Sequence, residues 1–499
     1  MGHDLFLVFP ELFLTGASIV LLLVAAWGGD KSAPLVTWVA VACLLLAALH
    51  TPHGHGTDAL AFGGLVTSDL FATFGRWLIY GSAAIALLAA AGWFGRSEDY
   101  RAEFPVLILF SCIGGGMMVS ATDLLTLYVG LELLSLSSYV LASFQRTDSR
   151  SSEAGLKYFV LGALASGLLL YGISLLYGFT GSTLFSDIAV ALRQGAEGGH
   201  SPEGQLFGMV FVLAGIAFKV SAVPFHMWTP DVYEGAPTPV AAFFSAAPKV
   251  AAMLLLTRIV IDAMGPAFDA WRQIIIFMAL ASTVLGGVAA IGQRNIKRLL
   301  AYSSINNVGF ALVGLAAAGQ AGVASVLVYM AVYVVMTLGS FLVVLKMRAE
   351  DSQPLESIDS LSGLARTRPG LALAMAIFML SLAGIPPLFG FYPKLLVFDA
   401  AVQADLAWLA AVAIATSVIG AFYYIKIVKI MYFDEAAPGF SRVREPVVGA
   451  LILLAALAVS PLGYLSIPYL EAAANDAAAS ISPNLATAPA AAAPHASGH

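Results

Sequence analysis

The sequence predicts an all-α polytopic membrane protein with about 14 transmembrane helices, from its composition, its apolar segments and the placement of its charges. Of the 499 residues, 60% are hydrophobic and 11% are charged, whereas soluble domains carry about 25% charged residues. Successive apolar segments are each long enough to span a bilayer, which takes about 20 helical residues. An ordinary soluble enzyme is therefore excluded. The net charge of −6 also provides no basic surface for nucleic acid.

The predicted helices follow one another with short polar connections. They span residues 5–27, 33–50, 68–94, 104–121, 123–145, 154–179, 206–226, 238–261, 273–292, 299–318, 322–346, 371–402, 404–432 and 446–466. The first lacks a basic stretch at its start and contains Glu11, so we expect a membrane helix rather than a cleaved signal peptide. The Ala/Pro-rich segment 470–499 is predicted to be a disordered tail.

Two of these helices contain proline in their interior, at SAVP (221–224) in the seventh and AGIPPLFG (383–390) in the twelfth. Proline removes a backbone donor and clashes with the preceding turn, so both helices are predicted to be discontinuous. The fourth to eighth helices and the ninth to thirteenth form two blocks of five, each with its broken helix in fourth place. Because five is odd, the second block is predicted to be inverted relative to the first. Transporters use such repeats, and the breaks mark the ion site.

The predicted organisation therefore has five parts. They are three N-terminal helices (1–103), a first repeat (104–261), an inverted second repeat (273–432), a final helix (446–466) and the tail (470–499). Most of the 24 lysines and arginines lie in loops that follow odd-numbered helices. Only Arg193 and Arg272 lie in loops that follow even-numbered helices. The positive-inside rule places the basic loops in the cytoplasm and both termini on the outer, periplasmic side.

Four ionisable side chains lie near the middle of separate predicted spans: Glu132, Lys219, Lys249 and Lys394. A charge at the centre of a bilayer costs about 3 kcal/mol on insertion scales, so such residues are rare unless a partner or a water path keeps them. Lys219 and Lys394 also lie within about two turns of the proline breaks, where unpaired backbone groups can bind water. A carboxylate such as Glu132 can control the protonation of a nearby lysine. The four residues predict a route for charge at one depth in the membrane.

Other polar side chains allow more than one interpretation. Neighbouring helix axes are about 8–10 Å apart, so waters or polar residues must bridge the four charges, and Tyr302 in the run YSSINN is a candidate bridge. His226, beside the first break, is either a proton relay or a hydrogen-bonded packing residue. Arg76, Lys157 and Arg258 lie nearer the ends of spans, and we expect them to extend toward the membrane surface. The inert alternative for the buried charges is a set of structural ion pairs.

The sequence contains no motif for redox or covalent chemistry. His50, His53 and His55 in HTPHGHG are reminiscent of a metal-binding tract, but no carboxylate cluster accompanies them, so a flexible polar loop is expected. Cys43 and Cys112 lie in apolar spans and provide neither a disulfide framework nor ligands for an iron–sulfur cluster. No metal-binding or cofactor-binding residues are therefore predicted.

The run VPFHMWTPDVYEGAPTPVAAFFSAAPKVAAM (223–253) resembles the signature of the antiporter-like subunits of respiratory complex I and of the Mrp cation/proton antiporters. Its continuation FFSAAPKVAA is similar to the subunit N type. Three further runs support this resemblance: YVGLELLSLSSYVL (128–141), QRNIKRLLAYSSINNVGF (293–310) and SLAGIPPLFGFYPKLLVF (381–398). Together the motifs cover most of the two predicted repeats.

The resemblance implies roles for individual residues. Glu132 and Lys219 match the family's helix-five glutamate and helix-seven lysine, which modulate and carry the pumped proton. Lys249 matches the connecting lysine of helix eight, and Lys394 matches the terminal residue of helix twelve on the exit side. Lys157 matches a family lysine at the start of helix six and becomes a further relay candidate. The family is also similar in its fourteen helices, inverted repeats and broken helices.

These observations predict a proton-translocating subunit in the membrane arm of NADH:quinone oxidoreductase, a multi-pass protein of the bacterial inner membrane. By the resemblance, the chain acts as part of a translocase enzyme and performs no redox chemistry alone. FMN, iron–sulfur clusters and quinone are expected in other subunits, and the expected partners are the other membrane-arm subunits, including antiporter-like ones. Two alternatives remain: a secondary antiporter of the Mrp type that exchanges sodium for protons, and a structural membrane spacer.

Overall fold

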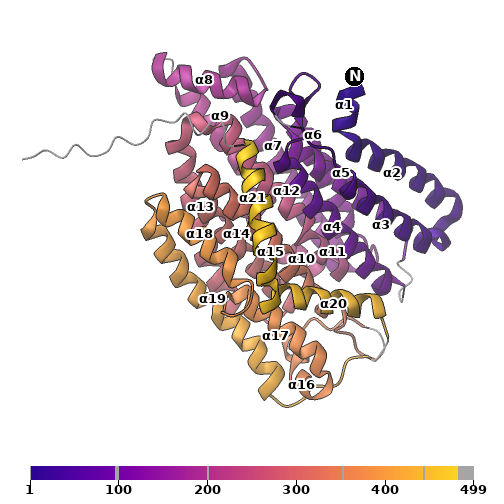
Figure 1. Cartoon of the computed structure of the whole chain (residues 1–499). Helices are drawn as coiled ribbons and strands as arrows, with labels where there is room; N and C mark the ends of the chain where they lie inside the picture. The colour runs from indigo at the N-terminus through magenta and orange to yellow at the C-terminus, as the bar shows by residue number, and fades with distance from the viewer. Residues whose placement is uncertain are drawn as a thin grey trace, which may run out of the picture.

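The computed structural model describes residues 2–54, 56–95, 100–198, 202–350, 353–441 and 444–481 (Figure 1). This part of the chain is a bundle of α-helices, with one short hairpin of strands β1 (Leu60–Ala61) and β2 (Val66–Thr67). Eleven of its helices are long and apolar enough to cross a membrane, or up to twelve if one bent pair is a single span. The predicted all-α polytopic membrane class is confirmed.

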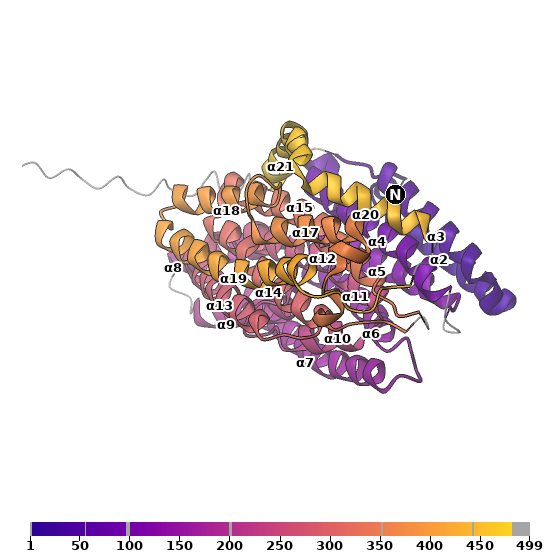
Figure 2. The same ribbon diagram turned by 90° about the horizontal axis from the view of Figure 1, so that it is seen from below.

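The number of spans differs from the fourteen predicted because three regions are not simple straight helices. α2 (Phe9–Gly28) and α3 (Ala33–Leu49) are joined by a single 3₁₀ turn, η1 (Gly29–Ser32), and together form one helical run of 41 residues. Gly29 adopts a φ of +57°, a value that glycine reaches without steric cost. Figures 1 and 2 show α2 and α3 side by side as a hairpin. The other two regions are the halves of the twelfth and fourteenth predicted helices.

The N-terminal part and the first block contain twelve α-helices. The remaining ones are α1 (Gly2–Leu7), α4 (Leu70–Phe94), α5 (Glu103–Ser120), α6 (Leu124–Ala142), α7 (Ser149–Thr180), α8 (Phe185–Gly198), α9 (Pro202–Val220), α10 (Trp228–Gly235), α11 (Thr238–Phe244) and α12 (Ala247–Arg258). Asp69, Asp123 and Asp148 cap α4, α6 and α7 by accepting hydrogen bonds from free backbone amides. The predicted eighth helix is divided at Ser245 and Ala246 into α11 and α12, and it ends in a π-turn, η3 (Ile259–Ala263).

The second block follows a short 3₁₀ turn, η4 (Gly265–Ala267). Its helices are α13 (Phe268–Ile291), α14 (Ile296–Ala317), α15 (Gly319–Leu345), α16 (Leu364–Thr367), α17 (Pro369–Ala383), α18 (Phe391–Gln403) and α19 (Ala407–Phe433). Both predicted interruptions are present, because α9 ends before Pro224 and α17 ends before Pro387. Each is followed by a separate helix, α10 and α18.

The C-terminal segment differs from its prediction. α20 (Pro446–Val459) and η6 (Pro461–Ser466) lead into α21 (Ile467–Ile481) at a bend of 69°. Residues 470–481 of the predicted disordered tail are therefore helical, and residues 482–499 lie outside the described part. The physical reason is that alanine has the highest helix propensity. α21 also buries Ala474, Ala477 and Ile481 where it packs against α15 and α4.

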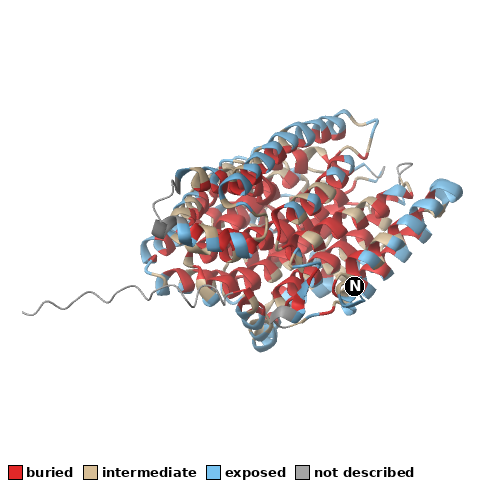
Figure 3. Ribbon diagram, turned by 90° about the horizontal axis from the view of Figure 1, so that it is seen from above, coloured by how far each residue is buried: buried red, intermediate tan, exposed pale blue. Residues whose placement is uncertain are grey.

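The centre of the molecule consists of α12, α14 and α15. Every residue of α12 is buried, and α14 and α15 are buried along most of their length. Figure 3 shows this buried interior surrounded by helices with exposed outer faces. α19 and α7 expose large apolar side chains such as Phe422 and Leu164, as a bilayer or a partner chain would require. Polar groups on the central helices are therefore far from bulk water.

Candidate functional site

Lys249 forms a hydrogen bond with the end of the first broken helix. Its side chain is 1% exposed, and Nζ donates a hydrogen bond of 3.1 Å to the carbonyl of Val220, the last residue of α9. In a continuous helix this carbonyl would accept from the amide four residues later. That residue is Pro224, which has no N–H. The buried amine therefore satisfies the carbonyl that proline leaves open.

Lys394 does the same at the second broken helix. Its Nζ donates 2.9 Å hydrogen bonds to the carbonyl of Ala383, the last residue of α17, and to Ser417 Oγ on α19. Pro387 is the fourth residue after Ala383, and because proline has no N–H, the donor that this carbonyl would have in a continuous helix is missing. The C-terminal end of a helix carries a partial negative charge that favours a cation. Two breaks that are far apart in sequence thus build the same lysine–carbonyl contact.

Lys219 lies in the last turn of α9, directly before Val220, and its side chain is buried. Its Nζ donates a hydrogen bond of 3.1 Å to Tyr139 Oη on α6 and lies 5.1 Å from the centre of that ring. The aromatic rings of Tyr158 and Phe218 also face the amine, at 5.8 and 5.5 Å. A positive charge is thus accommodated mainly by ring faces and one hydroxyl.

Glu132 lies on α6, seven residues before Tyr139, and interacts electrostatically with Lys219. Its Oε1 is buried without a hydrogen-bond partner in the described part of the chain. No salt bridge between described residues joins it to Lys219, so the predicted Glu–Lys couple acts through space. Its neighbours at the same face, Val129 and Leu136, are exposed. Glu132 therefore lies at the edge of the site.

A buried polar network lies on α14, α15 and α19, and α14 contacts both α10 and α18. Its hydrogen bonds join Tyr329 to Asn307 (2.7 Å), Asn307 to Tyr424 (3.3 Å), Ser303 to Tyr424 (2.5 Å) and Tyr333 to Ser304 (2.8 Å). Hydroxyl and amide groups of this kind can both give and receive a hydrogen bond. The network places such groups beside α14, which packs against both breaks, whereas Lys249 and Lys394 themselves bond to other partners.

The three predicted relay residues occupy different positions. Tyr302 is half-buried and makes no side-chain hydrogen bond to another described residue, whereas its neighbour Ser303 belongs to the network. His226 is half-buried at the first break, and its Nδ1 is buried without a partner among the described residues. Lys157 is 43% exposed and forms ion pairs with Glu153 (2.7 Å) and Asp231 (2.8 Å). The geometry brings none of the three into contact with the buried lysines.

Two arginines that we expected to extend to the membrane surface are instead buried in ion pairs. Arg76 is fully buried and donates to both carboxylate oxygens of Glu11, at 2.8 and 3.1 Å. Arg258 is 1% exposed and donates to both oxygens of Asp69, at 2.7 and 2.9 Å. The expectation was wrong because bidentate pairing satisfies a guanidinium inside the bundle. The partners are 65 and 189 residues apart, so sequence spacing gave no signal of them.

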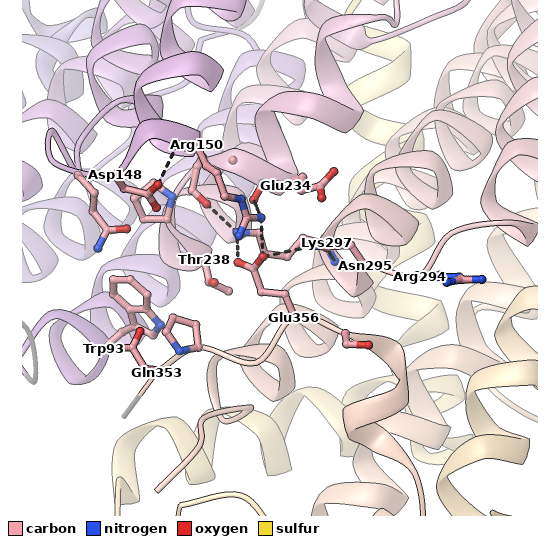
Figure 4. A pocket seen from close by; sticks show the side chains of 16 residues that line it. Trp93, Asp148, Arg150, Glu234, Thr238, Arg294, Asn295, Lys297, Gln353 and Glu356 are labelled. Atoms are coloured by element: carbon pink, nitrogen blue, oxygen red, sulfur yellow. Dashed lines mark hydrogen bonds and ion pairs between the residues drawn. The ribbon is translucent and has the colours of Figure 1, made fainter. Parts of the chain in front are cut away.

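A cavity of about 610 Å³ opens beside the junction of α10 and α11 (Figure 4). Glu356 is at its centre and pairs with Arg150 (2.7 Å) through one oxygen and with Lys297 (2.7 Å) through the other. Asn295 donates to Glu356 at 3.1 Å. Burial alone would raise the pKa of the Glu356 carboxyl, but the Lys297 ammonium and Arg150 guanidinium hold that pKa below its ordinary value of 4.5. The sequence prediction did not include this cluster.

The histidine loop shows no metal-like arrangement where it is described. His50 Nδ1 lies 3.0 Å from the carbonyl of Leu46, a contact within one helix end, and His55 lies outside the described residues. In the part of the chain that is described, no three His, Cys, Asp or Glu side chains gather in a way that could hold a metal ion. Cys43 and Cys112 are both buried and free.

Comparison with known proteins identifies the class to which this fold and these buried lysines belong. Residues 121–420 match the family model described as NADH:quinone oxidoreductase/Mrp antiporter, transmembrane. A chain of respiratory complex I from Thermus thermophilus superposes with a TM-score of 0.78 at 31% identity, over 93% of this chain and 99% of that one. A chain of the Mrp complex from Dietzia sp. has a TM-score of 0.83 over 95% and 97% of the two chains, but its 22% identity supports the fold alone.

The curated relatives are more specific. The NADH-quinone oxidoreductase subunit N of Rhizorhabdus wittichii is 64% identical over 483 residues, which cover 96% of this chain and 99% of the relative. The chain belongs to the NADH-quinone oxidoreductase subunit N family.

Proposed function

We propose that this chain carries protons through the membrane arm of NADH:quinone oxidoreductase along Glu132, Lys219, Lys249 and Lys394. The observation that carries the proposal is the repeated lysine–carbonyl contact at the two helix breaks, together with the buried network on α14, α15 and α19. Each amine has an oxygen acceptor, and bridging waters are expected to complete the path between them. Static ion pairs would need a carboxylate at each lysine, and Lys249 and Lys394 have none among the described residues.

In the proposed sequence of events, redox energy released in other subunits changes the charge near Glu132. This alters the stability of the proton on Lys219, since a carboxylate favours a nearby ammonium. Protonation changes then pass through Lys249 and the polar network to Lys394, from which a proton leaves on the outer side. The order follows the resemblance to the family.

The proposed function includes the finer architecture. It has fourteen spans, with α2 and α3 as two of them and the pairs α17–α18 and α20–α21 as one each. Residues 104–261 and 273–432 form the inverted repeats, supported by the matching breaks between α9 and α10 and between α17 and α18. The excess of lysine and arginine in alternate loops supports two outer termini.

The chain works as one subunit of a translocase in the bacterial inner membrane, together with other membrane-arm subunits. FMN, iron–sulfur clusters and quinone belong to other subunits of the complex in this proposal. This chain then contributes no redox centre, and its chemistry is limited to binding, holding and releasing protons.

The test is proton pumping by the assembled oxidoreductase with Lys219→Ala, measured as protons moved per NADH oxidised. We expect the ratio to fall, whereas Lys31→Ala, at an exposed turn, should leave it unchanged. Undiminished pumping by Lys219→Ala at normal electron transfer would refute the proposal. Transport that depends on sodium in a preparation without electron transfer would instead favour the Mrp-type antiporter.

A further inference from the structure

The cavity beside α10 and α11 is lined by the buried amine of Lys297, which is not part of the proposed proton route. Lys297 is 2% exposed but lines the cavity, where its Nζ donates a hydrogen bond of 2.7 Å to Glu356 Oε1. Glu356 in turn contacts the half-exposed Arg150. A carboxylate that touches both a water-filled cavity and a buried amine can pass a proton from one to the other.

Lys297 also faces inward. Its Nζ donates a 2.8 Å hydrogen bond to the carbonyl of Ala236, which ends α10. Tyr233 lies one turn earlier on α10, and its ring centre is 6.0 Å from the amine of Lys249. The Tyr233 hydroxyl is fully buried and has no hydrogen-bond partner of good geometry among the described residues. Such an unpaired hydroxyl is costly unless it has a use or binds water.

The first turns of α14 complete the connection. Lys297 and Ser304 are seven residues apart, so they share one face of the helix at a separation of about 10 Å. α10 packs against α14. Tyr333 donates to Ser304, and the Tyr233 hydroxyl lies near the same serine. The contacts thus run from Glu356 to Lys297, from Lys297 to the end of α10, and from the Tyr233 ring on α10 to the amine of Lys249.

At the opposite end of α12 the charged side chain is an arginine instead of a lysine. Arg258 lies nine residues beyond Lys249 and is held by Asp69 and Asp262, at 2.7 and 3.3 Å. A guanidinium does not give up its proton in a protein, so Arg258 cannot act as a relay.

We propose that Glu356 and Lys297 form the proton-uptake site that supplies Lys249. The inference rests on the proposed function, including the orientation that places this cavity in the cytoplasm. A proton from cavity water first neutralises the Glu356 carboxylate and weakens its ion pair. The Lys297 ammonium then passes its own proton inward, through Tyr233 and bridging water, to a neutral Lys249 amine. Glu356 reprotonates Lys297, which restores the ion pair and leaves one proton transferred.

Two substitutions separate a relay from a structural clamp. Glu356→Gln keeps a hydrogen-bonding side chain but cannot take up a proton. Lys297→Arg keeps the charge and can hold both Glu356 and Ala236, but it cannot release a proton. A clamp would tolerate Lys297→Arg, whereas a relay would not. Matched controls are Asp359→Asn, an exposed carboxylate three residues from Glu356, and Lys31→Arg at an exposed turn.

The experiment measures protons pumped per NADH oxidised by the complete oxidoreductase in membrane vesicles, with the amount of assembled complex measured in parallel. We expect Glu356→Gln and Lys297→Arg to lower the ratio as far as Lys249→Ala does, and the double variant Glu356→Gln/Lys249→Ala to lower it no further. Both controls should match the wild type.

Normal pumping by Lys297→Arg would show a structural clamp and overturn the inference. Loss of assembly in that variant would also overturn it, because Lys297 would then be required for the fold and not for proton uptake. Normal pumping by Glu356→Gln would overturn it as well. If these variants pump normally while Lys249→Ala does not, the proposed function stands and only the uptake site is wrong. If Lys249→Ala pumps normally, the route through Lys249 fails and the uptake site fails with it.

Discussion

At the residue scale, the site is defined by amines whose partners are neutral oxygens. Lys219 contacts a tyrosine hydroxyl, and Lys249 and Lys394 contact backbone carbonyls. A neutral acceptor favours the ammonium form of a lysine less than a carboxylate does, because it brings no opposite charge near the amine. These contacts therefore position the lysines without fixing their charge, as a translocated proton requires.

The hydroxyl of Tyr139 should matter more than its ring. Tyr139→Phe removes the acceptor of Lys219 but keeps the aromatic face, and a hydrogen bond to a charged group contributes about 1.5–3 kcal/mol. We expect Tyr139→Phe to slow proton pumping. The rate of NADH oxidation, measured with an uncoupler present, should stay unchanged. Tyr158→Phe is the matched control, since its ring also faces Lys219 at 5.8 Å. Equal effects of the two variants would contradict a specific role for the Tyr139 hydroxyl.

The pair of Glu11 and Arg76 predicts a stability effect. Glu11→Ala leaves the fully buried Arg76 guanidinium without its bidentate partner, and breaking a buried pair in this way costs about 3–5 kcal/mol. The temperature at which the chain dissociates from the solubilised complex should fall. The double variant Glu11→Ala/Arg76→Met removes both charges and should recover most of the loss. An unchanged dissociation temperature for Glu11→Ala would show that the pair contributes little to the stability of the complex.

At the element scale, the two broken helices combine a proline with a buried lysine. A proline lies four residues after Val220 and four residues after Ala383, so the carbonyl of each lacks its usual helical donor. In each case a lysine from another helix donates the missing hydrogen bond. The end of α17 has a further constraint, because Gly384 adopts a φ of +79° next to the Lys394 side chain. The break is therefore built from three residue types with different physical roles.

Gly384→Ala tests this construction. A left-handed backbone costs a residue with a Cβ about 1–2 kcal/mol, and the added Cβ would lie 2.7 Å from Lys394 Cδ. We expect Lys394 to be displaced and the number of protons pumped per NADH to fall. Gly370→Ala, in the first turn of α17, meets nothing within 4 Å and should behave as the wild type. A Gly384→Ala complex with normal pumping would show that the position of Lys394 is not critical.

At the scale of the whole molecule, the orientation in the membrane gives a further prediction. In the proposed topology, which follows from the excess of basic residues in alternate loops, Lys31 is on the cytoplasmic side and Arg193 is on the outer side. A cysteine introduced at either position, in a chain without Cys43 and Cys112, should react with an impermeant thiol reagent from the corresponding side only. The opposite pattern of labelling would reverse the proposed topology and move the Glu356 cavity to the outer face.

Most of the helices could be predicted from the sequence because a membrane span is a local requirement of length and hydrophobicity. The breaks were predictable for a similar reason, since proline acts on its own helix. The pairing of Lys297 with Glu356 was not predictable, because it depends on how separate helices and a loop pack. α21 was missed because its alanines suggested low complexity, whereas burial against α15 and α4 makes that segment a helix.

The lysine–carbonyl contact at the first break links two amines mechanically. Val220, whose carbonyl Lys249 holds, is the residue directly after Lys219. A movement of the Lys249 amine therefore acts on the Val220–Ser221 peptide unit, one residue after Lys219, and a rotation of that peptide unit changes the hydrogen bond of Lys249. The two lysines are thus joined through one hydrogen bond and one residue of backbone, so the geometry at one amine depends on the position of the other.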